Sequence, residues 1–580
     1  MSIVRHVIMT LVVCGAAPAI AAKGGIPVRA KPVKREQVRG RLYDVWTTTS
    51  LAKVFKDHQR PEGAADAVQM AAARNEYEAA QVVFKAIEPI SELRCEWGVV
   101  KRVATKAGKK PRRKRYEIPR DCLRWNFVGY VPVTKNTQNT PPEELVRQAP
   151  ADFPDPLLED RSIGVAAGEC QPIWLTVKVP KKAPPGRYEG TFAIISESGV
   201  DQIPVTLEVF DFALPDERHI PVTNWFSAGQ IAKHHNVEAW SEKHWDLLGR
   251  YAENMYEHRQ NVCLTPLSLI GISKKADGTF SFDFTRFDRW IEAFEKHGHM
   301  DFFEGSHVAH RDGGWTTKNI KFRDFGVTLP DGGKKALPGD EVIRPLMSAL
   351  QAHLEEEGLV DRFWIHIADE PIETCLASWE EKSRIVHEAA PKIRRIDAIE
   401  APEFHGTLEI WVPRLDHLHD WYDRYKRAQK EQGAELWFYT CLYPNQTYPN
   451  RLIDYSLLKT RILHWMNWHF EAPGYLHWGL NHWTDDPFAS TQKGNLPPGD
   501  AFIIYPGSEG PMNSIRWEAM RDGLEDYEYL HLLAKRTGSR ETSTRFTGRL
   551  IHSIIDYEHD PAALLSTRRE IAEAIVEAGG

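Results

Sequence analysis

The sequence predicts an N-terminal β-sandwich followed by a (β/α)8 TIM-type barrel and a short helical C-terminal tail. The length of 580 residues is too great for one compact core. Short strand-like segments with few helical windows dominate the first part, whereas strand-like and amphipathic helical windows alternate after residue 217. We therefore expect a signal peptide over 1–22, the sandwich over 23–217, the barrel over 218–537 and a helical segment over 538–580.

The first domain is predicted from strand and turn chemistry. Segments 79–84, 172–179 and 205–210 are rich in β-branched residues and alternate between apolar and polar positions. Pro184-Pro185-Gly186 precedes the strand-like segment 188–194, which is typical of a hairpin turn. Short strands at this spacing favour a β-sandwich.

The second domain is predicted from eight strand candidates with helical windows between most of them. Eight parallel strands with covering helices over roughly 300 residues favour a barrel. The connection between the fifth and sixth candidates is the shortest, and the tail from residue 541 is expected to pack beneath or beside the barrel. The eight candidates are 222–226, 262–267, 302–308, 363–368, 395–399, 408–412, 435–440 and 475–480.

The N-terminus has the pattern of a secretory signal peptide. Arg5 and His6 precede an apolar segment at 7–13, and small residues at 19–22 suit a cleavage site. No later run approaches the roughly 20 apolar residues of a membrane span. We therefore expect a periplasmic or secreted protein.

Charge and cysteine content limit the partners. A formal net charge of −7 gives no reason to expect a nucleic-acid partner, and the basic residues within 109–115 favour a solvated hairpin loop. The six cysteines after the signal peptide lack CxxC spacing, so a structural zinc site is not expected. Disulfide pairing and oligomeric state stay open.

A carboxylate pair follows the fourth predicted barrel strand. The apolar segment 363–368 ends in Asp369 and Glu370, and Pro371 stops the strand. Carboxylates are rarely buried without partners, and barrel enzymes place their chemistry at the C-terminal strand ends. The pattern favours acid/base chemistry on a polar substrate by these two residues.

Aromatic and polar residues are predicted around the same mouth. Such a ring of aromatic and hydrogen-bonding groups around two carboxylates suits a sugar. His307 and His310 with Glu304 lack the spacing of a metal site, so no metal or cofactor is expected. The expected substrate-binding residues are His307, Trp411, Arg414, Tyr439, Trp478, Asn481, His482 and Trp483.

A second catalytic carboxylate is not evident. Most retaining glycosidases use two carboxyl groups about 5.5 Å apart, but the seventh strand ends in Tyr439-Thr440-Cys441. Glu400, Asp416, Asp485 and Asp486 fall in predicted loops without a clear strand-end position. Adjacent carboxylates suit another scheme, in which one protonates the leaving oxygen and the other stabilises a reacting 2-acetamido group of the substrate.

Several segments together resemble glycoside hydrolase family 123, which overlaps domain of unknown function 4091. The resemblance implies a β-sandwich followed by a barrel and a retaining β-N-acetylgalactosaminidase working through the acetamido group. It implies Glu370 as acid/base and Asp369 as acetamido-orienting residue, with Tyr439 at the acetamide oxygen and Trp478 in the floor. The matching segments are 72–76, 153–158, 255–259, 368–371, 437–441, 478–483 and 521–529.

Three functions follow as hypotheses. The leading one is an exported exo-β-N-acetylhexosaminidase that prefers N-acetylgalactosamine. The second is a glycosidase for non-acetamido sugars that uses a loop carboxylate such as Asp416 or Asp485. The third is a carbohydrate-binding protein with a non-catalytic barrel, which the intact Asp369-Glu370 pair disfavours.

Overall fold

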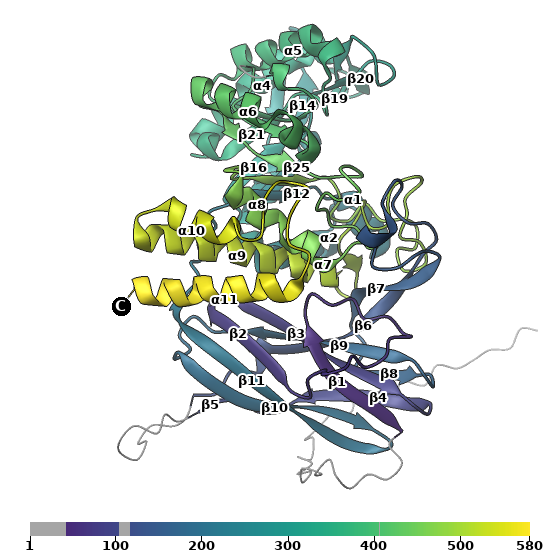
Figure 1. The fold of residues 1–580 in the computed structure, drawn as a ribbon. Coiled ribbons are helices and arrows are strands. Elements are labelled where there is room, and N and C mark those ends of the chain that lie inside the picture. Colours follow the sequence, from purple (N-terminus) through teal and green to yellow (C-terminus); the bar gives the residue numbers. More distant parts are fainter. Residues whose placement is uncertain (1–41, 104–115, 405–406, 580) are drawn as a thin grey trace, which may run out of the picture.

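The computed structural model describes residues 42–103, 116–404 and 407–579 (Figure 1). The predicted signal peptide and the basic residues of the predicted loop at 109–115 lie outside the described residues. All six cysteines of the described part are free thiols. None of the described helices is both long enough and apolar enough to cross a bilayer.

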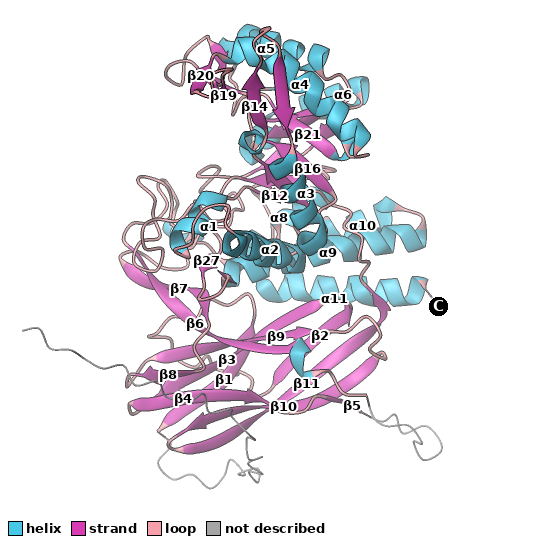
Figure 2. Ribbon diagram, turned by 180° about the vertical axis from the view of Figure 1, so that it is seen from behind, coloured by secondary structure: helices cyan, strands magenta, loops and turns pink. Residues whose placement is uncertain are grey.

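The N-terminal domain is a β-sandwich, as predicted. Its two sheets enclose a common apolar core to which both contribute, for example Val82 and Leu175 from one sheet and Phe192 and Leu207 from the other (Figure 2). In sheet order, the first sheet is β1 (Tyr43–Thr49), β3 (Tyr77–Ala86), β9 (Cys170–Lys178), β6 (Leu123–Val133) and β7 (Ala151–Leu158). The second is β2 (Val68–Arg74), β11 (Gly199–Ala213), β10 (Gly186–Ser196), β4 (Ile90–Trp97) and β8 (Ser162–Val165), with β5 (Lys101–Arg102) beside β10.

The C-terminal domain is mixed α/β, and each predicted strand range contains an observed parallel strand. They form two sheets, of three strands (β12-β26-β25) and six strands (β13-β16-β21-β22-β23-β24). The seventh predicted strand is shared between the sheets, because β24 joins one and β25 the other on either side of Trp437. The strands are β12 (Val222–Asn224), β13 (Val262–Thr265), β16 (Phe302–Gly305), β21 (Phe363–His366), β22 (Arg394–Ile399), β23 (Ile410–Pro413), β24 (Glu435–Leu436), β25 (Phe438–Tyr439) and β26 (Tyr475–His477).

Side chains from both sheets meet in one small interior cluster. Trp364 packs edge-to-face on Trp437 at 5.3 Å between ring centroids, with Val262, Ile410 and Leu476 in the same cluster. These residues come from β13, β21, β23, β26 and the β24–β25 junction, so both sheets contribute to one core.

Helices follow most strands, as the alternating pattern predicts. Among the described residues between β22 and β23, only a short 3-10 turn (Pro402–Phe404) occurs, where the predicted unit was shortest. The helices are α1 (Ala228–His234), α2 (Glu242–Glu257), α3 (Thr285–Gly298), α4 (Gly339–Glu356), α5 (Leu376–Ala389), α6 (Leu415–Gln432), α7 (Leu457–Arg461), α8 (Leu463–His469) and α9 (Ile515–Thr537).

Short antiparallel strands interrupt the α/β pattern and were not predicted. One sheet has the order β15-β14-β19-β20, and β17 pairs with β18 shortly after the third parallel strand, β16. These strands are β14 (Gly271–Lys274), β15 (Phe280–Asp283), β17 (Ala309–Arg311), β18 (Ile320–Phe322), β19 (Phe325–Thr328) and β20 (Lys334–Leu337); β27 (Tyr505–Pro506) and β28 (Pro511–Met512) precede α9.

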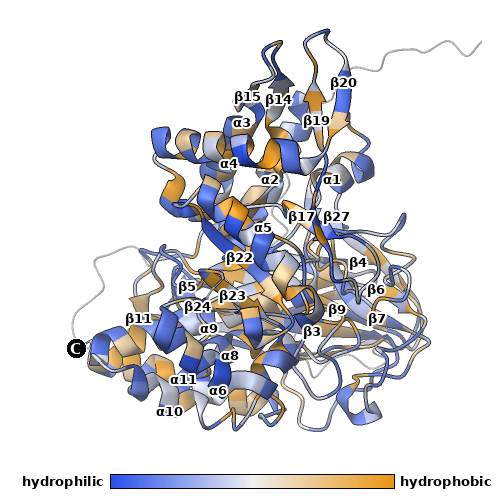
Figure 3. Cartoon of the chain, turned by 90° about the horizontal axis from the view of Figure 1, so that it is seen from above, coloured by the Kyte–Doolittle hydropathy of each residue, from blue (hydrophilic) through white to orange (hydrophobic). Residues whose placement is uncertain are grey.

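The C-terminal tail is helical, as predicted, and consists mainly of α10 (Arg540–Thr547) and α11 (Pro561–Ala578). Helix α11 lies between α9 and the sandwich, packed on α9 and β11 (Figure 1). It is amphipathic, with Leu564, Ile571 and Ile575 buried (Figure 3). Its buried Arg568 binds Glu78 of the sandwich at 3.3 Å and Asp526 of α9 at 2.8 Å, so the tail joins the two domains.

Candidate active site

Glu370 lies just beyond the fourth parallel strand, in a bend with unusual backbone geometry. Strand β21 is buried throughout, and Glu370 follows it with a φ of 47°, in the left-handed region. A non-glycine residue pays about 1–2 kcal/mol for this conformation, and such strain clusters at active sites. Arg311 donates a hydrogen bond to the Glu370 carbonyl oxygen and supports the bend.

Tyr439, at the end of β25, lies against the Glu370 carboxyl group. Its hydroxyl oxygen is 2.6 Å from Glu370 Oε1. Burial of the Glu370 carboxyl group, and then the adjacent Asp369 charge, raise the pKa of Glu370 to about 7. Burial and the Glu370 charge also raise the pKa of Tyr439, so the phenol keeps its proton. Glu370 is therefore suited to donate a proton near neutral pH.

A second carboxylate, Glu400, shares the Tyr439 hydroxyl. Glu400 Oε1 is 2.7 Å from the Tyr439 oxygen, and Arg414 Nη1 lies 3.2 Å from the same carboxylate oxygen. Arg414 also binds Asp416 through two hydrogen bonds of 2.7 and 3.0 Å. His417 Nδ1 is 3.6 Å from Glu400 Oε2. This arrangement keeps a negative charge on Glu400 beside a permanent guanidinium cation.

A buried histidine between two carboxylates lies beneath the bend. His366 Nδ1 is 3.1 Å from Asp397 and its Nε2 is 3.0 Å from Glu304, and all three side chains are fully buried. Burial alone would lower the pKa of His366, but these two hydrogen bonds raise it to about 9. Asp397 also accepts hydrogen bonds from the backbone N–H of Ile367 and of Ala368, at 3.1 and 3.0 Å. The network therefore anchors the backbone that leads into Asp369 and Glu370.

Asp369 projects to the open side of the same bend. Its side chain is 58% exposed, and its Oδ1 lies 3.8 Å from His307 Nε2. His307 packs edge-to-face against Trp225 at 5.3 Å. Burial, and then the charge of His366, lower the pKa of His307 to about 3, so its ring is neutral. Asp369 thus stays accessible to a ligand.

Two of the predicted substrate-binding residues, Trp478 and His482, lie next to each other after β26. Trp478 is half-buried and packs against the interior cluster that contains Tyr439. Its ring lies 5.2 Å from the ring of His482. Burial, and then the Lys493 charge, lower the pKa of His482 to about 4. These two rings, the first of them beside the Tyr439 cluster, form an apolar surface with polar edges.

Three predicted site residues have structural positions instead. Trp411 is fully buried in the core outside the strands, because its neighbours Ile410 and Val412 take the interior positions of β23. Trp483 is buried in the same outer core and donates to the Ile504 carbonyl oxygen at 2.7 Å. Asn481 uses both ends of its amide on the Ser227 backbone, at 2.8 and 3.2 Å.

Glu400 has the strand-end position that the sequence did not make evident. Strand β22 ends at Ile399, so Glu400 follows it directly. The predicted fifth strand also ended at 399, and this was the available signal. The buried network of Glu304, His366 and Asp397 was not predicted, because its three members look like ordinary strand residues in the sequence.

One group of ligand-type side chains occurs in the described residues, formed by His307, His366 and Asp397, whose donor atoms lie within 4.8 Å of one another. Both ring nitrogens of His366 already bind carboxylates. A metal would have to displace one of these bonds and a proton, so the donor set fits an ion pair better than a metal ion.

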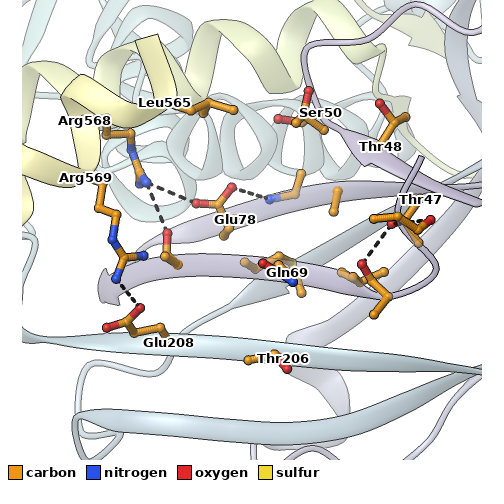
Figure 4. A pocket seen from close by; sticks show the side chains of 18 of the residues that line it. Thr47, Thr48, Ser50, Gln69, Glu78, Thr206, Glu208, Leu565, Arg568 and Arg569 are labelled. Carbon is orange, nitrogen blue, oxygen red and sulfur yellow. Dashed lines mark hydrogen bonds and ion pairs between the residues drawn. The ribbon is translucent and has the colours of Figure 1, made fainter. Parts of the chain in front are cut away.

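A cavity of about 840 Å³ lies elsewhere, between the sandwich and α11 (Figure 4). Its charged side chains are paired with each other, as Arg569 with Glu208 at 2.7 Å and Arg568 with Glu78 at 3.3 Å. No residue of β21, β22 or β25 lines it. It is separate from the carboxylate site.

Comparisons with known proteins identify the family of the chain. The family model of the glycoside hydrolase 123 catalytic domain matches residues 225–533, and the model of the glycoside hydrolase 123 N-terminal domain matches 53–196. No curated protein matched the chain.

One solved structure shows a similar fold over nearly the whole chain. A family 123 glycoside hydrolase from Clostridium perfringens, studied for glycolipid glycan hydrolysis, has a TM-score of 0.74 at 15% identity, covering 92% of this chain and 98% of that chain. An endo-β-1,4-mannanase from Thermotoga petrophila has a TM-score of only 0.32 at 13% identity, covering 54% and 77% of the two chains. The catalytic-domain match includes the carboxylate pair, Tyr439 and Trp478. The chain belongs to glycoside hydrolase family 123 and is a glycoside hydrolase.

Proposed function

We propose that the protein is a retaining exo-glycosidase that removes terminal β-linked N-acetylgalactosamine, or a related 2-acetamido sugar, by substrate-assisted catalysis. The observation that supports it most is the adjacent pair, in which Glu370 has a pKa of about 7 while Asp369 stays open to a ligand. An acid and a stabilising carboxylate side by side suit a substrate that brings its own nucleophile.

In the first step, Glu370 donates its proton to the glycosidic oxygen as the bond to the anomeric carbon breaks. The acetamido carbonyl oxygen attacks that carbon and forms a cyclic oxazolinium ion. Asp369 accepts a hydrogen bond from the acetamido N–H and stabilises the positive charge. In the second step, ionised Glu370 takes a proton from water, which attacks the anomeric carbon and reopens the ring.

Glu400 makes a two-carboxylate mechanism the second candidate. The two carboxyl groups lie 2.6 and 2.7 Å from the Tyr439 oxygen, so these two oxygens are at most about 5.3 Å apart, which is no farther than in retaining pairs. The Tyr439 oxygen lies between them, however, and leaves no room there for an anomeric carbon. The ion pair with Arg414 also makes Glu400 a weaker nucleophile.

The other loop carboxylates are less suitable. Asp416 is held by two hydrogen bonds from Arg414. Asp485 is 96% exposed and pairs with Lys233 at 2.7 Å. Each is paired with a cation, which makes it a weaker nucleophile for a glycosidase acting on non-acetamido sugars.

The substrate class follows from the same site and from the relative. The half-buried Trp478 ring offers a stacking surface to a sugar. Because the Clostridium perfringens relative was studied for glycolipid glycan hydrolysis, we propose a glycan or glycoconjugate as the substrate.

Three further assignments are proposals. We propose that the eight parallel strands form a (β/α)8 barrel, supported by the interior cluster that draws on both sheets. We place the domains at 23–217, 218–537 and 538–580. We propose export to the periplasm or medium through residues 1–22, which N-terminal sequencing of the mature protein would test.

A panel of nitrophenyl glycosides tests the function. We expect turnover of the β-N-acetylgalactosaminide, no turnover of the matching β-galactoside, and competitive inhibition by a GalNAc-thiazoline that mimics the oxazolinium ion. Equal turnover of the β-galactoside without thiazoline inhibition would favour Glu400 as nucleophile. Sugar binding without any turnover would favour the non-catalytic hypothesis.

A further inference from the structure

The Tyr439 hydroxyl has one proton and two carboxyl neighbours. Glu370 Oε1 and Glu400 Oε1 lie 2.6 and 2.7 Å from the same phenol oxygen, both at hydrogen-bond distance. A phenol donates one hydrogen bond, and burial keeps this phenol protonated. If both carboxyl groups were ionised, one of them would face the phenol oxygen without a proton in between. The geometry therefore requires a proton on one of the two.

The surrounding charges decide which carboxyl group holds that proton. Arg414 contacts both oxygens of Glu400 through Nη1, at 3.2 and 3.3 Å, so the negative charge is favoured there. Glu370 has no such cation on its carboxyl group, since Arg311 binds its backbone oxygen. The negative charge of Asp369 next to it favours the protonated form.

We propose that Glu400, held by Arg414, is a positioning residue that keeps Glu370 protonated through a shared hydrogen bond with Tyr439. In this arrangement Tyr439 donates to ionised Glu400, and the Glu370 carboxylic acid donates to the Tyr439 oxygen. This inference rests on the proposed role of Glu370 as acid. It also revises the role that the resemblance implies for Tyr439, because its hydroxyl is occupied by two carboxyl groups before a substrate arrives.

The groups that face this pair come from four segments. Glu370 faces Asp369 on its own bend, Tyr439 and Cys441 after the seventh strand, Glu400 after the fifth strand, and Arg414 at the start of α6. Cys441 is buried and its pKa is raised by that burial, so it is uncharged. Glu400 and Arg414 are thus the two charged groups, outside the Asp369-Glu370 pair itself, that a substitution can neutralise.

Two variants with opposite expected shifts test the proposal. Glu400→Gln keeps the side-chain shape and removes the negative charge, and Arg414 keeps its partner Asp416. We expect the pKa at which Glu370 ionises to fall by about one unit or more, since a neighbouring negative charge favours the protonated form of a carboxyl group. Arg414→Gln removes the cation beside Glu400, so the pKa at which Glu370 ionises should rise. Glu403→Gln is the matched control, because Glu403 lies three residues further on the same loop and pairs with Arg424.

The readout is the carboxylic-acid C=O stretch in pH-difference infrared spectra, assigned by its loss in Glu370→Gln. The alkaline limb of kcat/KM with a turned-over glycoside should shift in parallel. The proposal is overturned if both variants titrate like the Glu403→Gln control. Because the infrared titration needs no substrate, it tests the shared proton even if the acetamido mechanism fails, and that failure would appear separately in the glycoside panel.

Discussion

The Tyr439 hydroxyl oxygen lies 2.6 Å from Glu370 Oε1, although the two residues end different strands of the parallel sheets. The left-handed backbone of Glu370 accompanies this contact, because the chain bends sharply after β21. Glu370 is therefore oriented by its contact with Tyr439, and burial raises its pKa. The predictions below follow from that arrangement.

Glu370→Gln should lower kcat by about 10²- to 10⁴-fold on glycosides with poor leaving groups, because protonation of the leaving oxygen is lost. Substrates with an activated aryl leaving group should keep more activity, since they depart without a proton. Steady-state kinetics across a series of leaving groups measures this difference. Wild-type rates on natural and aryl glycosides alike would show that Glu370 is not the acid.

The pH dependence has a defined sign. Glu370 has a pKa of about 7, above the usual value for a glutamate, so it is protonated below pH 7 and ionises as the pH rises. We expect kcat/KM to fall about tenfold per pH unit above this pKa. A profile recorded with a poor leaving group checks it. A plateau that extends unchanged to pH 9 would contradict the assignment.

Asp369→Asn should lower kcat by about 100-fold or more, because the developing oxazolinium charge loses its carboxylate. Affinity for the GalNAc-thiazoline should fall in the same variant. Asp485→Asn is the control, since Asp485 is 96% exposed and pairs with Lys233. If Asp485→Asn were the inactive variant, the loop-carboxylate alternative would replace this account.

His366 should stabilise the fold in a pH-dependent way. Its folded pKa of about 9 is raised above the usual 6.5, so its contribution is complete below pH 6.5 and is lost as pH rises through 9. His366→Gln leaves Glu304 and Asp397 without their shared cation and should cost about 3–5 kcal/mol of unfolding free energy at pH 6.

Urea unfolding at pH 6 and pH 9.5 measures the effect of His366→Gln, and the loss should be smaller at the higher pH. His552→Gln is a suitable control because His552 is exposed. A loss that is the same at both pH values would mean that His366 is uncharged in the folded state.

Substitutions of Trp478 and Trp483 should change different properties, substrate binding for Trp478 and the free energy of unfolding for Trp483. Trp483 is fully buried in the outer core, so Trp483→Ala should cost about 3–5 kcal/mol of unfolding free energy. Trp478 is half-buried at the mouth, so Trp478→Ala should mainly raise KM. Thermal unfolding and kinetics on both variants test this, and the reverse pattern would place the sugar surface elsewhere.

Periodicity was enough to predict the two-domain fold. Every expected parallel strand exists, because buried strands have apolar runs such as 363–365 and the helices between them have apolar stripes. The antiparallel strands from β14 to β20 were missed, since segments of three or four residues have too little periodicity to be recognised. The closed barrel stays a proposal.

The sequence predicted only part of the site. The errors arose because the sequence does not show from which face of its strand a side chain projects. Glu370, Tyr439 and Arg414 are joined through Glu400, and Trp478 packs beside Tyr439, while the roles of these residues stay predictions. Trp411 lies between Ile410 and Val412, whose side chains face the interior cluster. Neighbouring residues of a strand point to opposite faces, so the Trp411 side chain faces the other core. A sequence shows which residues lie at the end of a strand. The face to which each side chain points depends on the register of the strand, which only pairing with neighbouring strands defines.

The central claim is that the substrate's acetamido oxygen is the nucleophile, and a series of N-acyl substrates tests it most directly. Replacing the acetyl hydrogens by one, two and three fluorines makes that oxygen progressively less nucleophilic without changing the leaving group. We predict that kcat/KM falls steeply with each fluorine. Rates independent of fluorination would contradict the account and transfer the nucleophile to a protein carboxylate, of which Glu400 is the nearest to Glu370.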